Sequence, residues 1–163
     1  MTSDPLKTGG GLLDDLYREI ILDHYRKPRN HDPLHAPSCQ ADGANPLCGD
    51  TIHLEVALDG DTIEEIAFAG MGCSISQASA SMMTEYVKGR SVQAAREGAE
   101  AFQRMMTSGE TQSVEGFDDI DALQGVAKFP ARVKCASLSW KTLEQALEGG
   151  GAATTEEGHE SDD

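Results

Sequence analysis

Three of the four cysteines in this sequence stand where a strand or a helix is expected to begin or end. Cys48 precedes a β-strand pattern, Cys73 follows one, and Cys135 falls in the first turns of a helical pattern. Glycines beside the first two let a metal ion or a second sulfur approach the backbone, and a helix N-terminus stabilises a thiolate. Thiolates bind metals and attack electrophiles. These residues therefore predict a metal site or a nucleophilic cysteine.

The spacing of these cysteines excludes two common kinds of site. The intervals of 25 and 62 positions contain no C-x-x-C pair, which zinc fingers and thioredoxin-like motifs require. Taken singly, each cysteine is equally well explained as a small buried apolar residue. Taken together, the three favour one site assembled from loops that lie far apart in the sequence.

A tetrahedral zinc site needs one donor beyond three thiolates. Asp50 is the nearest candidate, because it lies two residues after Cys48 in the same short loop. The histidines are expected to have surface or packing roles instead; they are His24, His31, His35, His53 and His159. Cys39, the remaining cysteine, stands among alternating residues and is expected to pack in the core or in an edge strand.

The composition predicts one acidic globular domain. The chain has 163 residues, 39% of them hydrophobic, and a formal net charge of −15. That charge repels phosphate backbones and anionic membranes, so neither nucleic acid nor a membrane is an expected partner. The sequence shows no targeting signal or membrane span, and four cysteines without a secretory signal favour a reducing compartment. We therefore expect a cytoplasmic protein.

Hydrophobic periodicity and turn residues predict an α+β fold, in which a small antiparallel sheet of about three strands is covered on one face by helices. The expected elements are a helix over 12–26, an edge strand over 38–42, a hairpin over 51–70, helices over 74–88 and 92–108, a helical turn over 119–123, and a last helix that starts within 130–135. The first helix is expected to bury one apolar face, formed by Leu13, Leu16, Tyr17, Ile20 and His24.

The ends of the chain have a different composition from its body. Residues 1–11 lack apolar periodicity and predict a flexible arm, and residues 149–163 are too rich in Gly, Thr and acids to bury a core. The domain is therefore expected over residues 12–148, followed by a disordered acidic tail.

Three sequence runs resemble the SufU branch of the IscU-like family, whose domain is also known as the NifU N-terminal domain. These runs are NPLCGD at 45–50, GMGCSIS at 70–76 and FPARVKCASLSWK at 129–141. They occur in the family's order, and the resemblance extends over residues 12–147. The scaffold branch has a histidine immediately before its third cysteine and a shorter segment between its second and third cysteines. Lys134 and the long connection over 89–129 therefore favour the SufU branch.

The resemblance implies a zinc site and a reaction. The implied zinc ligands are Cys48, Asp50, Cys73 and Cys135. The implied activity is that of a zinc-dependent sulfurtransferase, which accepts persulfide sulfur from a pyridoxal-phosphate-dependent cysteine desulfurase of the SufS type. The sulfur then passes to iron–sulfur cluster assembly, with SUF cluster scaffold proteins as further partners. The roles of Cys39, Arg132 and Lys134 are left open.

Cys48 is the expected acceptor, because it sits in a glycine-flanked loop whereas Cys73 and Cys135 are tied to helix starts. The principal alternative is an iron–sulfur cluster assembly scaffold that uses the same ligands. A purely structural zinc in an adaptor protein is a second alternative. A cysteine hydrolase is a weaker one, because the sequence around Cys73 lacks nucleophile-elbow spacing.

Overall fold

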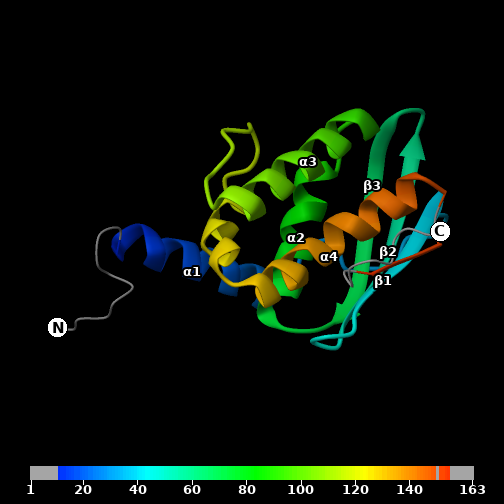
Figure 1. Cartoon of the computed structure of the whole chain (residues 1–163). Helices are drawn as coiled ribbons and strands as arrows, with labels where there is room; N and C mark the ends of the chain where they lie inside the picture. Colours follow the sequence, from blue (N-terminus) through cyan, green and yellow to red (C-terminus); the bar gives the residue numbers. More distant parts are fainter. Residues whose placement is uncertain (1–10, 150, 155–163) are drawn as a thin grey trace.

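A computed structural model describes residues 11–149 and 151–154 of the chain (Figure 1). One helix comes first, three strands follow it, and the remaining helices precede a short last strand. The elements are α1 (Gly11–Arg26), β1 (Cys39–Asn45), β2 (Asp50–Asp59), β3 (Thr62–Met71), α2 (Ser74–Val87), α3 (Val92–Ser108), the 3-10 helix η2 (Ile120–Lys128), α4 (Pro130–Leu147) and β4 (Gly151–Thr154). The predicted α+β class is confirmed.

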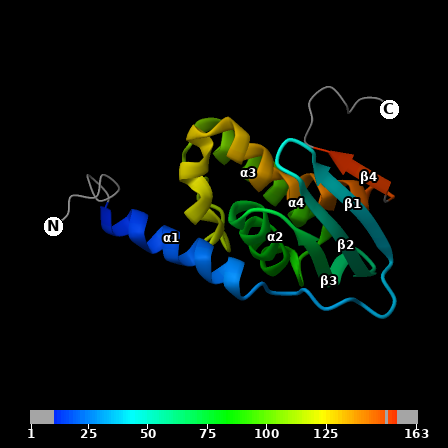
Figure 2. The same cartoon turned by 90° about the horizontal axis from the view of Figure 1, so that it is seen from below.

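The sheet has the strand order β3-β2-β1-β4 (Figure 2). The first three strands are antiparallel, as predicted, with Leu54 opposite both Ala41 on β1 and Phe68 on β3. Alternate residues on β2 point to opposite faces, so the buried side chains of Ile52 and Leu54 lie on one face and His53 on the other. The hairpin over 51–70 is confirmed, with Gly60 at positive φ in its turn.

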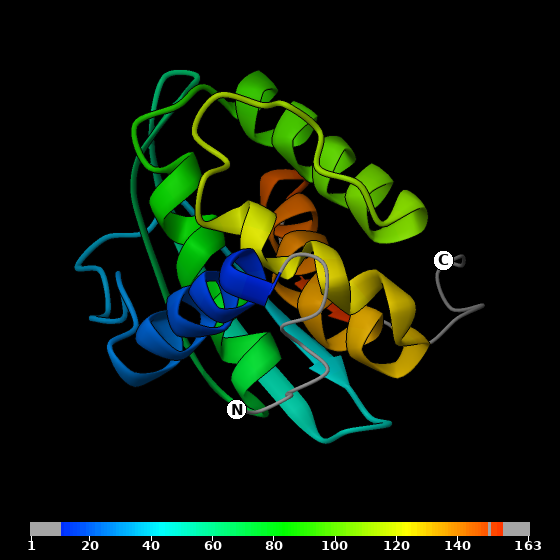
Figure 3. The same ribbon diagram turned by 90° about the vertical axis from the view of Figure 1, so that its left-hand side faces the viewer.

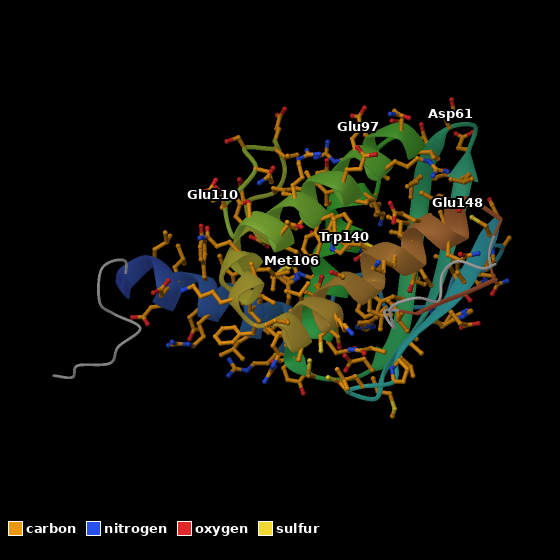
Figure 4. All side chains as sticks on the ribbon, in the orientation of Figure 1. Asp61, Glu97, Met106, Glu110, Trp140 and Glu148 are labelled. Atoms are coloured by element: carbon orange, nitrogen blue, oxygen red, sulfur yellow. The ribbon has the colours of Figure 1, made fainter. Side chains whose placement is uncertain are left out.

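Helices cover the apolar face of this sheet. The helices α2 and α4 pack directly on the strands, and α1, α3 and η2 contact these two helices from outside. Ser79 on α2 donates a hydrogen bond of 2.6 Å to the carbonyl of Ala136 on α4, so the small residues of α2 allow a close approach. Trp140, which stacks on Phe102 with ring centroids 4.9 Å apart, fills the space between α3 and α4 (Figure 4).

Both ends of α3 lie where the sequence predicts them. The Ser91 side chain accepts a hydrogen bond from the backbone N–H of Ala94 and caps α3 at its start. Gly109, at a φ of 77°, caps the same helix at its end, where a residue without Cβ is favoured.

The sequence prediction was wrong for part of the C-terminal segment. Gly151–Thr154 form β4, which pairs in parallel with β1 and places Gly151 opposite Ala41. A sheet edge offers unpaired backbone groups to any nearby chain, so this pairing needs no apolar side chains. Residues 155–163, and residues 1–10 of the arm predicted over 1–11, lie outside the described residues, whereas Gly11 begins α1. The helical segment before α4 is also longer than the turn expected over 119–123.

The predicted apolar face of α1 is only partly buried. His24 is buried and Ile20 is half-buried against the core, but the side chains of Leu13 and Leu16 are 49% and 54% exposed. The reason is that the C-terminal part of α1 rests on α2, while its N-terminal part projects beyond α2 (Figure 2). In Figure 3, α1 therefore lies in front of α2.

His24 fastens α1 to the rest of the fold. Its Nδ1 lies 2.7 Å from the Ser81 hydroxyl on α2, and its Nε2 lies 2.7 Å from a carboxylate oxygen of Asp119, next to η2. Ser81 also accepts a hydrogen bond from the backbone N–H of Arg29. One imidazole thus joins three segments of the chain.

We expect His24→Ala to lower the free energy of unfolding by about 2 kcal/mol, because it leaves a cavity and a buried hydroxyl with one partner fewer. His31→Ala is the matched control, since the His31 side chain is half exposed and its nearest acid is 3.7 Å away. Urea titrations of both variants make the measurement. Equal effects of the two substitutions would contradict this role of His24.

Candidate metal centre

The turn between β1 and β2 presents two of the candidate ligands together. The backbone N–H groups of Cys48 and Gly49 both donate to the carbonyl of Asn45, at 3.2 and 2.8 Å. Gly49 has a φ of 75°, a conformation that glycine adopts without strain. This tight turn leaves Cys48 exposed and directs Asp50, which is 1% exposed, into the protein.

Cys135 approaches the same point from the start of α4. Its side chain is 1% exposed, and its Sγ lies 3.6 Å from the Sγ of Cys48. The two sulfurs and a carboxylate oxygen of Asp50 all lie within 4.8 Å of one another. Two thiolates on one tetrahedral zinc ion, with bonds of ~2.3 Å, would be about 3.8 Å apart. The observed separation therefore fits a shared metal ion.

Cys73 lies at the edge of this group. It occupies the N-cap position of α2, and its backbone N–H donates to Oδ1 of Asp50 over 3.1 Å. Its thiol is close enough to act on Cys135, but it is not among the three residues whose donor atoms lie within 4.8 Å. The fold thus brings Cys48, Asp50 and Cys135 together and places Cys73 half-buried beside them.

Asn45 belongs to this site, although the sequence analysis did not select it as a site residue. It is fully buried, and its Nδ2 donates to Oδ2 of Asp50 at 3.4 Å and to Sγ of Cys135 at 3.6 Å. Its Oδ1 is buried without a hydrogen-bond partner. An asparagine before a turn is ordinarily explained by the geometry of the turn. Only its burial beside the candidate ligands Asp50 and Cys135 distinguishes Asn45 as a site residue.

The surroundings of the cluster disfavour the thiolate form of Cys135 unless a cation is bound. The pKa of the Cys135 thiol is raised far above its usual value, first by burial, then by hydrogen bonds with Asp50 and Cys48, and then by the negative charge of Cys73. Several anionic donors crowded in a low-dielectric environment disfavour a further thiolate. A divalent cation reverses that effect, because a coordinating thiol is deprotonated. Three sulfurs and one carboxylate suit zinc in particular.

Gly72 makes room for the buried carboxylate. A Cβ at this position would collide with Oδ1 of Asp50 and with the hydroxyl of Ser76. We expect Gly72→Ala to displace Asp50 and weaken zinc binding at least about tenfold, the scale on which misoriented ligands act. Gly125→Ala is the control, since a Cβ there meets nothing within 4 Å. Competition with a chromogenic chelator measures both affinities, and equal affinities would contradict the prediction.

The other residues considered from the sequence lie elsewhere. His24 is bonded inside the fold, His53 bonds to Asp42 and Glu55 on the outer face of the sheet, and His159 is outside the described residues. Cys39 is half-buried at the start of β1, six residues from Asn45, which corresponds to about 20 Å along a strand. The described cysteines are all free thiols.

Comparison with known proteins identifies relatives for most of the chain. Residues 16–136 match the model of the NifU-like N-terminal domain. The chain is 52% identical over 135 residues to the zinc-dependent sulfurtransferase SufU of Bacillus subtilis, covering 83% of this chain and 91% of that protein. It is 42% identical to the iron–sulfur cluster assembly scaffold protein IscU of Streptococcus pyogenes, with coverages of 83% and 84%.

A solved structure has the same architecture. It is that of FiSufU from Fervidobacterium islandicum, described as an iron–sulfur cluster assembly scaffold protein for the SUF system. The TM-score is 0.75 at 35% identity, and the match covers 85% of this chain and 99% of that one. No helix in the described part of the chain is both long and apolar enough to cross a membrane.

Proposed function

Because this chain belongs to the family of NifU-like N-terminal domains, we propose that it is a zinc-dependent sulfurtransferase of iron–sulfur cluster assembly. The similarity to a protein with that activity, at 52% identity, exceeds the similarity to the scaffold protein, at 42%. The observation that carries the proposal is the difference in exposure within the cluster. Cys48 is exposed, whereas Asp50 and Cys135 are buried beside it.

The proposed ligands are Cys48, Asp50, Cys73 and Cys135. Cys48, Asp50 and Cys135 have donor atoms within 4.8 Å of one another. The fourth proposed ligand, Cys73, is held beside them because its backbone N–H donates to the Asp50 carboxylate. The donor set of three sulfurs and one oxygen is one that zinc accepts in tetrahedral geometry. When bound, zinc supplies the positive charge that holds these thiols in the thiolate form near neutral pH.

Sulfur transfer requires a thiolate that can reach its donor. We assign this role to Cys48: its Sγ attacks the outer sulfur of a persulfide on a cysteine of the partner, and a new S–S bond forms. The S–S bond of the donor breaks, and the partner's cysteine leaves as a thiolate. One sulfur atom is exchanged between two cysteines with no net oxidation. Cys135 is too deeply buried to take part without a change of the fold.

The proposed donor is a cysteine desulfurase of the SufS type, whose pyridoxal phosphate forms the persulfide. The proposed recipients are SUF cluster scaffold proteins. This exchange needs reduced thiols, and the free cysteines of the described chain are compatible with a reducing compartment, so we propose that the protein acts in the cytoplasm.

A desulfurase assay tests the function. The chain purified in air should contain one zinc ion and no coloured cluster, and it should increase desulfurase turnover with cysteine as substrate. The alternative function, an iron–sulfur scaffold, predicts a stable coloured cluster on the same residues and no stimulation. Lys134 and the absence of any described histidine beside the cluster favour the transferase.

A further inference from the structure

The side chain of Asn45 has a task that the turn between β1 and β2 does not explain. The turn is held by the backbone carbonyl of Asn45, which accepts from the N–H groups of Cys48 and Gly49 and which any residue could supply. The side chain is fully buried instead, and its amide nitrogen carries two hydrogens. That nitrogen lies 3.4 Å from Oδ2 of Asp50 and 3.6 Å from Sγ of Cys135. Two of the proposed ligands therefore share one amide donor.

The two acceptors fix the orientation of this amide. If the amide were turned over, its oxygen would face the carboxylate of Asp50, and two acceptors would meet. In the orientation observed, Oδ1 of Asn45 is buried and has no hydrogen-bond partner in the described part of the chain. A buried, unpaired carbonyl oxygen costs stability, so an apolar side chain would suit this place better if burial alone mattered. The unpaired oxygen therefore indicates that the N–H groups on the same amide have a function.

Hydrogen bonds from N–H groups are distributed unequally among the proposed ligand sulfurs. Within residues 11–149 and 151–154, the sulfur of Cys135 accepts such a bond from Asn45, and the sulfurs of Cys48 and Cys73 accept none. An N–H donor disperses the charge of a thiolate or carboxylate and fixes its direction. Asp50 and Cys135 are thus restrained, whereas the exposed Cys48 is left with its full charge.

We propose that Asn45 is a positioning residue of the metal centre, which holds Asp50 and Cys135 in their ligand positions through the two N–H groups of its amide. The inference rests on the proposed function, in which Cys48 attacks a persulfide. A sulfur that forms a new S–S bond has less charge to offer a metal, so the other ligands have to keep their places during the transfer. The unequal hydrogen bonds therefore separate two restrained ligands from one thiolate that is able to react.

Cobalt(II) titrations of the full chain test this role without any partner. Cobalt(II) takes the place of zinc in tetrahedral thiolate sites, and its absorption bands report the geometry of the ligands. The variants are Asn45→Ala and Asn45→Val, of which the second fills more of the space of the amide but has no N–H group to donate. Both should bind cobalt(II) at least about tenfold more weakly than the unmodified chain, with shifted absorption bands, because misoriented ligands act on this scale.

Thr142→Val is the matched control, because it also removes a buried hydrogen bond. The Thr142 hydroxyl donates to the carbonyl of Leu138 over 2.8 Å within α4. This variant should keep the cobalt(II) affinity and the absorption bands of the unmodified chain, and an equal effect of the control would overturn the proposal. Unchanged affinity in both Asn45 variants would also overturn it. So would a loss in Asn45→Ala that Asn45→Val restores, because a cavity would then explain the effect.

Circular dichroism of the metal-free chains separates positioning from folding. The backbone carbonyl that holds the turn is present whatever side chain stands at position 45. We therefore expect the metal-free variants Asn45→Ala and Asn45→Val to have the helix content of the unmodified chain. If neither variant folds, with or without metal, the side chain serves the fold, and the proposal is overturned.

Zinc release during turnover tests the consequence for sulfur transfer. Zinc-loaded chains are incubated with desulfurase and cysteine, and a chromogenic chelator reports the zinc that is lost. Asn45→Ala should lose zinc at least about tenfold faster than the unmodified chain, with the added sulfur still on Cys48. Equal rates of loss would overturn the inference that Asn45 keeps the ligands in place during the transfer. If the unmodified chain takes up no sulfur, the proposed function fails, and the cobalt(II) titrations still decide the role of Asn45.

Discussion

Replacing Cys48 by alanine is expected to reduce desulfurase stimulation to the level of the desulfurase alone while leaving the fold in place. Cys48 is exposed in a turn, so its removal creates no cavity in the core. Three candidate ligands remain, and water can complete a zinc site with three protein ligands, as it does in catalytic zinc sites. Zinc affinity should therefore fall without the metal being lost. No other candidate thiol is both exposed and adjacent to the metal position.

The measurement combines turnover with a map of the transferred sulfur. The unmodified chain and the variant are incubated with desulfurase and cysteine, the persulfides are trapped by alkylation, and the added sulfur is located by mass spectrometry. Cys39→Ser is the control, because Cys39 is separated from the site by most of β1. If the added sulfur lies on Cys73 or Cys135, or if Cys48→Ala still stimulates turnover, Cys48 is a ligand only.

Replacing Cys135 by serine should have the largest effect on metal binding and stability. The Cys135 side chain is 1% exposed and interacts with Cys48, Asn45 and Asp50, so no water can easily take its place. A serine hydroxyl is a poor zinc ligand, and here it would be buried among acceptors. A ligand present at a thousand times its Kd contributes ~4 kcal/mol to stability. For a domain of this size, its loss corresponds to a fall in Tm of about 10 °C.

Elemental analysis and thermal unfolding test this prediction together. Cys135→Ser should retain well under one zinc ion per chain after dialysis against a chelator, and chelator should scarcely change its Tm. Cys39→Ser again serves as the control and should keep both the metal and the chelator-sensitive Tm. Full zinc occupancy in Cys135→Ser would remove Cys135 from the ligand set.

The parts of the fold that local chemistry determines could be predicted from the sequence. Alternating apolar residues with an Asp-Gly turn specify the β2–β3 hairpin, and Ser91 and Gly109 specify the ends of α3, because each signal acts within a few residues. The burial of α1 could not be predicted in the same way. Its periodicity gives an apolar face, but the extent of α2 decides how much of that face is covered.

For the candidate site, the sequence by itself determined the donor types and their places at the junctions of elements. Residue chemistry and turn geometry are local properties, so Cys48 and Asp50 could be assigned to one loop before any fold was known. Only the tertiary structure decided which donors meet, that Cys48 alone of the clustered thiols is exposed, and that Asn45 joins them. These features depend on contacts between residues far apart in the chain, such as the 90 positions between Asn45 and Cys135, and packing of the whole domain sets such contacts.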